Sequence, residues 1–131
     1  MRLMDYNIRV IQTDLMRKIE RAMNSAVISK TNWSKANTTV CYNENSNCST
    51  ISLHGHQIAT VDHNTKAVKL DSCGYETVTT KSRLNALLSE VMYGAKVFQK
   101  NFDWFVSMYN QTESFCDGMI LLDHGNRLEV V

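Results

Sequence analysis

Apolar residues recur every three or four positions between Tyr6 and Val27, which is the spacing of one face of a helix. The charged residues of this segment fall largely off that face. The pattern predicts an amphipathic helix over residues 6–27. If part of the apolar face stays uncovered in the monomer, a symmetric homodimer through this helix is the natural way to cover it. The predicted apolar face comprises Ile8, Ile11, Leu15, Ile19, Ala22 and Ala26.

The pattern changes after this helix, because β-branched residues become frequent and clusters of Asn, Ser and Asp separate them. We expect a strand over residues 37–42, a long strand over 49–63 and a return strand over 67–72. Apolar alternation along the long strand breaks at Gly55, which predicts a β-bulge at that residue. The segment therefore predicts an antiparallel meander of three or four short strands.

A second helix is predicted over residues 77–95 by a second apolar stripe at helical spacing. Thr79 or Thr80 is expected to be its N-cap, because a threonine hydroxyl accepts from the unpaired amides of a first turn. Gly94 is expected to close the helix. Residues 96–109 then read as a β-hairpin.

A last apolar segment, residues 115–123, predicts one more strand. The order of elements, with no linker or internal repeat between them, is typical of an α+β fold in a single domain, residues 1–131. We expect a long N-terminal helix, an antiparallel β-meander, a second helix and a C-terminal hairpin, with the helices on one face of the sheet.

Composition limits the classes of partner. The chain of 131 residues has a net charge of +1 and 44% hydrophobic residues, as folded globular domains do. So small a net charge gives no overall attraction to nucleic acid or to an anionic membrane. The sequence has no apolar run of the ~18 residues that a membrane span requires, and charges interrupt its first residues, unlike those of a signal peptide. We expect an intracellular protein whose four cysteines stay reduced.

Three of the four histidines lie between Ser52 and Thr65, which raises the question of a metal site. His54 and His56 are two positions apart on a predicted strand, so their side chains would share one face. A bulge at Gly55 would rotate one of them away, and no Asp or Glu at matching spacing completes a ligand set. His63 is expected to be solvated in a turn. We expect surface histidines, no bound metal and no cofactor.

Other catalytic patterns are weaker still. The chain has no G-x-S-x-G motif, no glycine-rich phosphate loop and no pair of carboxylates at helical spacing. We therefore expect a protein that is not an enzyme.

Four segments together resemble small tailed-phage proteins that are mostly uncharacterised. The family pattern reads W-x-K-A-N-T-x-V, L-x-G-N-x-I-A, a glycine-aromatic-x-T, and T-T-K-x-R-L-N. The resemblance implies a phage protein that works in the host cytoplasm. Where the pattern has Asn after the glycine, this chain has His56, which weakens the case for a metal site. The segments are Trp33–Val40, Leu53–Ala59, Gly74–Thr77 and Thr79–Asn85.

The start of the second helix is the best candidate for binding. Free amides, two threonine hydroxyls and two cations in one turn would suit a phosphate or a carboxylate. The alternatives are a solvated helix start, or Arg83 paired with a neighbouring acid. Nearby aromatic residues could stack on a base. The candidate binding residues are Lys81, Arg83, Thr79, Thr80, Trp33, Lys35 and Tyr75.

Three functions follow from these patterns. The first is a phage accessory protein that binds a host or antiviral-defence protein without catalysis and inhibits or modulates it. The alternative is a nucleic-acid-binding or nucleotide-binding protein that uses the basic helix start. The third is an enzyme built on the histidines and cysteines.

Overall fold

The computed structural model describes residues 3–131, with side chains from Met16 onward. Within these residues the chain forms two helices, α1 (Leu3–Ser29) and α2 (Val78–Val91). The strands are β1 (Trp33–Lys35), β2 (Thr38–Asn43), β3 (Cys48–Leu53), β4 (His56–Asp62), β5 (Val68–Leu70), β6 (Lys96–Lys100), β7 (Asp103–Met108), β8 (Gln111–Ser114), β9 (Met119–Asp123) and β10 (Leu128–Val130).

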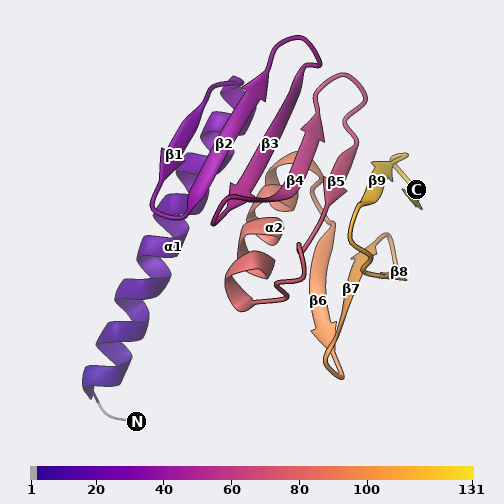
Figure 1. The fold of residues 1–131 in the computed structure, drawn as a ribbon. Coiled ribbons are helices and arrows are strands. Elements are labelled where there is room, and N and C mark those ends of the chain that lie inside the picture. Colours follow the sequence, from indigo (N-terminus) through magenta and orange to yellow (C-terminus); the bar gives the residue numbers. More distant parts are fainter. Residues whose placement is uncertain (1–2) are drawn as a thin grey trace.

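The strands form two antiparallel sheets. The larger sheet has seven strands in the order β1-β2-β3-β4-β5-β9-β10, and the smaller has three in the order β6-β7-β8. Figure 1 shows both helices behind the seven-stranded sheet, with α2 next to β6 of the smaller sheet. The predicted α+β fold, with its meander and second helix, is therefore confirmed.

The core lies between the large sheet and the two helices. From Met16 onward, α1 buries Ile19 and Ala26 of the predicted stripe. The earlier stripe positions, Ile8, Ile11 and Leu15, lie outside the described side chains, so the dimer through this helix stays a prediction. None of the described helical residues form a stretch long and apolar enough to cross a membrane. The fully buried large side chains are Met23, Ile51, Ile58, Leu70, Leu84, Leu87, Leu88, Leu121, Val27, Val40, Val68 and Val97.

The predicted long strand over residues 49–63 is wrong, because it is two strands joined by a tight turn. Leu53 pairs with His56, and the two residues between them have positive φ, 51° at His54 and 80° at Gly55. Two positive φ angles define the turn type that best matches the twist of a hairpin, and glycine suits its second position. Gly55 is therefore a turn residue, not a bulge.

The bulge lies three residues further on. Ile51 pairs with Ala59 while Ser52 pairs with Gln57, so Ile58 is the extra residue of β4. Ile58 and Ala59 are consequently both buried, although they are neighbours in the chain. Because two neighbouring residues are buried, the alternation of buried and exposed positions shifts by one residue at Ile58. From the sequence, we assigned this shift to Gly55.

Two boundaries also differ from prediction. The N-cap of α2 is Thr77, which is extended (φ −102°) and accepts a hydrogen bond from the Thr80 amide. Thr79 and Thr80 lie inside the first turn and do not cap it. At the other end the α-helix stops at Val91, and Gly94 (φ 99°) serves the turn into β6.

The C-terminal part holds more strands than expected. The hairpin predicted over residues 96–109 is confirmed as β6 and β7, and β8 adds a third strand. The strand predicted over residues 115–123 is the shorter β9, which joins the large sheet between β5 and β10.

Candidate functional site

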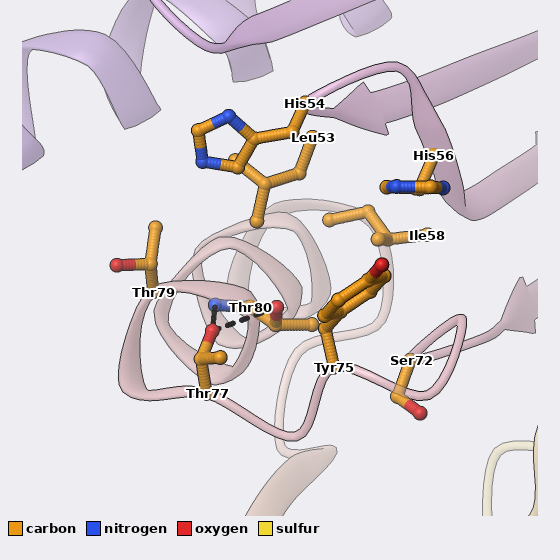
Figure 2. A pocket seen from close by; sticks show the side chains of 9 residues that line it. All are labelled: Leu53, His54, His56, Ile58, Ser72, Tyr75, Thr77, Thr79 and Thr80. Atoms are coloured by element: carbon orange, nitrogen blue, oxygen red, sulfur yellow. Dashed lines mark hydrogen bonds between the residues drawn. The ribbon is translucent and has the colours of Figure 1, made fainter.

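A hollow of about 380 Å³ opens where the β3–β4 turn faces the start of α2. Three elements form it: the β3–β4 hairpin, the loop from β5 to α2, and the first turn of α2. Figure 2 shows the imidazoles on the hairpin side and the threonines on the helix side. The lining residues are Leu53, His54, His56, Ile58, Ser72, Tyr75, Thr77, Thr79 and Thr80.

The two-residue turn between β3 and β4 forms the hairpin side of the hollow. It places His54 and His56 on either side of the opening, and both side chains are exposed. The His54 amide donates to the Asn37 carbonyl at 2.8 Å, which ties this turn to the neighbouring β1–β2 turn. Leu53 and Ile58 are buried beneath and give the hollow an apolar floor.

The loop from β5 to α2 is held by a buried serine. The amide and the hydroxyl of Ser72 both donate to Asp117 Oδ1, each at 2.7 Å. The Tyr75 amide in turn donates to the Ser72 carbonyl at 2.9 Å. The loop thus holds Tyr75 at the rim, where its ring lies 4.9 Å from that of His56, centroid to centroid, with the planes tilted by 36°.

The helix side of the hollow is the capped end of α2. Thr77 Oγ1 accepts from the Thr80 amide at 3.1 Å and lies 3.0 Å from the Thr80 hydroxyl. Thr80 is buried, whereas Thr79 is half-exposed. An apolar floor, two aromatic rings and a helix N-terminus give a site that can hold a side chain or a small molecule with both an apolar and a polar part.

Only some of the predicted binding residues meet at this hollow. Tyr75, Thr79 and Thr80 line it, together with the two histidines that we did not count as binding residues. Lys81 follows in the first turn of α2, half-exposed, but does not line the hollow. Trp33 and Lys35 lie on β1, an edge strand of the sheet that does not line the hollow, and Trp33 packs against the core.

Arg83 does not face the surface, so the expectation of an outward-facing pair of cations is wrong. Its side chain is 2% exposed, and its Nη1 lies 2.8 Å from Glu20 Oε2. Its Nε also donates to Thr38 Oγ1 at 3.1 Å. The alternative that we considered, pairing with a neighbouring acid, is confirmed. The guanidinium joins α2 to α1 and β2 inside the protein.

The histidines do not converge on a common point. Among the described residues, no group of three or more His, Cys, Asp or Glu side chains is placed to hold a metal. His54 and His56 flank the hollow and Figure 2 shows their rings apart. That the purified protein carries no metal stays a prediction, which metal analysis tests.

His63 is not the solvated turn residue that we expected. It is half-buried, its Nε2 lies 2.8 Å from the Ser49 hydroxyl, and its ring meets that of Tyr42 edge-on. A serine beside a histidine is the start of a nucleophilic site, but Ser49 is 0% exposed, so a substrate cannot reach its hydroxyl. The pair stabilises the meander.

Acid should therefore weaken the fold through His63. Burial lowers the pKa of His63, and the charges of Lys30 and Lys66 lower it further. The unfolded chain then binds the proton more readily, so the free energy of unfolding should fall as the pH drops below about 6.5. In His63→Gln, the loss between about pH 7.5 and about pH 5.5 should be smaller than in the parent, measured by urea unfolding.

The exposed His54 gives the control for this prediction. His54→Gln should keep the parent's pH dependence. An equal loss of stability in all three proteins would show that His63 does not carry the effect.

The comparison with protein families decides where the chain belongs. The model of the family described as Kyanoviridae Gp96 protein matches residues 16–122. The chain is a member of this family. The Kyanoviridae are tailed cyanophages, so the predicted tailed-phage family is confirmed. No curated protein and no solved structure matches the chain.

In this Gp96-family protein, some of the residues that carry the phage pattern hold the fold. Arg83 and Asn85 make internal contacts, and Gly55 forms a turn. The pattern also supplies most of the hollow, since six of the nine lining residues occupy pattern positions: Leu53, Ile58, Tyr75, Thr77, Thr79 and Thr80. Two further signals in the sequence fit the hollow: the glycine after His54, which fits a hairpin turn, and Thr77 ahead of the second apolar stripe, which fits an N-cap.

Proposed function

We propose that this phage protein acts in the host cytoplasm by binding a host or antiviral-defence protein, which it inhibits or modulates without catalysis. The hollow at the start of α2 supports the proposal, because its rim exposes apolar surface that the fold does not use. Tyr75, which lines the hollow, is 55% exposed, and Val78, which follows the lining residue Thr77 in the chain, is 75% exposed. An exposed tyrosine beside a hollow with an apolar floor is typical of the residues that dominate protein–protein binding energy once a partner covers them.

The shape of the hollow indicates how a partner side chain would contact it. A partner side chain that enters the hollow would meet Leu53 and Ile58 at its floor and the ring pair of His56 and Tyr75 at its rim. The loop that carries Tyr75 is already fixed by the Ser72–Asp117 hydrogen bonds, so binding loses little conformational freedom there.

A nucleotide or a nucleic acid is the second candidate. The two rings beside the α2 N-terminus favour it, since a base can stack on them while a phosphate meets the first-turn amides. The buried Arg83 weakens it, because Lys81 then remains the one first-turn cation for the phosphate.

The test compares two variants with the parent in capture from host extract. His56→Ser/Tyr75→Ser should lose the protein that the parent captures, while Tyr93→Ser, which removes a still more exposed tyrosine elsewhere (87%), should keep it. With the captured protein purified, the double variant should bind roughly tenfold more weakly or worse. Equal binding by all three proteins would place the contact elsewhere.

Oligonucleotides separate the two candidates. Binding that weakens steeply with salt and is lost in the double variant would favour the nucleic acid over the host protein.

A further inference from the structure

A second hollow, of about 330 Å³, lies where the C-terminal ends of both helices meet the turn between β4 and β5. It shares no lining residue with the hollow at the start of α2. Its volume is at the small end of the range for small-molecule sites, about 300–1,000 Å³. Four aliphatic and four ionisable side chains line it, two of them lysines, and we call it the lysine hollow.

The aliphatic side chains give the lysine hollow an apolar wall that the fold leaves partly open. Val27 of α1 and Val61 of β4 are buried, and Val91 at the end of α2 is half-buried. Ile28, in the last turn of α1, is 57% exposed although it is a large apolar residue. A ligand with an apolar body would cover this wall and remove it from water.

The two lysines reach this hollow from separate elements. Lys30 directly follows α1, and Lys66 lies in the turn between β4 and β5. Both side chains are exposed, and neither forms an ion pair with any of the side chains that the structure describes. Both charges nevertheless act on one place, because each lowers the pKa of His63, which also lines the hollow. Two ammonium groups without an internal partner can receive an anion.

Neither turn needs a lysine for its shape. Lys30 has φ 56° and ends α1 in the left-handed conformation that glycine usually supplies, with the Thr31 amide donating to the Ala26 carbonyl at 3.0 Å. Lys66 has φ 66°, and its amide donates to the Asp62 carbonyl at 2.8 Å. Glycine would form both turns with less strain. The lysines therefore contribute charge and not conformation.

Glu90 determines which charge of ligand suits the site. It is the one acidic side chain among the lining residues, and it lies in the last turn of α2. Burial and the two lysines keep His63 neutral near pH 7, so the lining carries two positive charges and one negative charge. A ligand with one negative charge balances this lining, whereas a dianion such as phosphate would leave an excess of negative charge.

We propose that the lysine hollow binds a small aliphatic monocarboxylate. The carboxylate meets the ammonium groups of Lys30 and Lys66, and the apolar body covers the wall that Ile28 leaves exposed. An apolar body without a charge would leave both lysines unpaired, and a carboxylate without an apolar body would leave the wall in water. The site uses no residue of the hollow at the start of α2, so its test is independent of the proposed function.

Titration of the full chain with hexanoate, followed by NMR at neutral pH, tests the site. Hexanoate should shift the signals of the residues that line the lysine hollow. Acetate keeps only the charge and hexanol only the apolar chain, so each should bind roughly tenfold more weakly or worse. Lys30→Gly/Lys66→Gly should weaken hexanoate binding about tenfold or more without lowering the melting temperature, because glycine suits both turns.

Three further variants and one spectroscopic signal locate the contact. Lys30→Gln/Lys66→Gln removes the same charges but keeps side-chain bulk, and should lose hexanoate in the same way. Lys69→Gln, which removes an exposed lysine on β5, should bind hexanoate as the parent does. Glu90→Gln should tighten binding, because it removes the repelling charge.

The imidazole of His63 reports the bound carboxylate directly. The negative charge of hexanoate opposes the two lysines, so its binding should raise the pKa of His63. Asp62 already acts on this imidazole in the same direction, and its contribution stays as it is. The imidazole signals of His54, beyond the opposite end of β4, should not move.

Three results would overturn the proposal. The first is a parent protein whose hollow signals do not respond to hexanoate at up to about 10 mM. The second is hexanoate binding that both double lysine variants retain, and the third is equal binding of hexanol. A lower melting temperature in Lys30→Gly/Lys66→Gly, with hexanoate binding unchanged, would show that the lysines stabilise the helix end and the turn and hold no ligand.

Discussion

Replacing Arg83 with methionine is expected to lower the free energy of unfolding by about 3–5 kcal/mol, because it leaves a buried carboxylate without its cation. The guanidinium lies 2.8 Å from Glu20, whose side chain is only 12% exposed. The Ser82 hydroxyl also donates to this carboxylate at 2.6 Å, and it cannot neutralise the charge. Urea unfolding of the parent and the variant measures the difference.

Two further variants show whether the ion pair is the cause. Lys81→Met removes a half-exposed cation two residues earlier, and it should change stability by no more than about 0.5 kcal/mol. Glu20→Leu/Arg83→Met removes both charges and should recover much of the loss, since apolar groups of similar volume can replace a buried pair. A loss below about 1 kcal/mol in Arg83→Met would contradict the structural role given to this residue.

The direction of the Arg83 side chain could not be predicted from the sequence. Its position near the start of a helix is a local property that the spacing predicted, although the N-cap at Thr77 places Arg83 in the second turn and not in the first. Which side of the helix faces α1 depends on Glu20, 63 residues earlier in the chain. From the sequence, Arg83 could either bind an external anion at the helix start or pair with an acidic side chain of the protein. Only the tertiary packing distinguishes these two roles.

The helices and most strands were predictable because their apolar periods are long and regular. Ile19 and Ala26 of α1 follow the predicted helical stripe into the core. The hairpin at Gly55 was not predicted, because a turn and a bulge both break the alternation at a glycine. The actual bulge at Ile58 supplied the phase shift and made the two strands look like one.

The hollow could be predicted only in part. Tyr75, Thr79 and Thr80 were singled out as binding residues from the helix start alone. His54 and His56 were examined as metal ligands, since two histidines on one strand share a face. The turn between them and the loop from β5 instead bring His56 to Tyr75 and leave His54 on the other side of the hollow. No local pattern shows that contact, which joins residues on separate elements.

Asn85 is the second residue whose loss should be severe. It lies on α2 and bonds both backbone groups of Val97 on β6: the Val97 amide donates to Oδ1 at 2.7 Å, and Nδ2 donates to the Val97 carbonyl at 2.9 Å. Val97 is fully buried, so water cannot replace these partners. With a cost of about 1–3 kcal/mol for each orphaned group, Asn85→Ala should lower the free energy of unfolding by roughly 2–4 kcal/mol.

Asn24 provides a matched control for this prediction. It is buried between the helices, its Nδ2 donates to the Ala86 carbonyl at 2.9 Å, and its Oδ1 has no partner among the described residues. Asn24→Ala therefore removes one bond and also an unsatisfied oxygen, and should cost about 1 kcal/mol or less. Hydrogen exchange at the Val97 amide should accelerate in Asn85→Ala and not in Asn24→Ala. Equal destabilisation by the two variants, with the Val97 amide still protected, would mean that Asn85 contributes packing and not the two backbone hydrogen bonds.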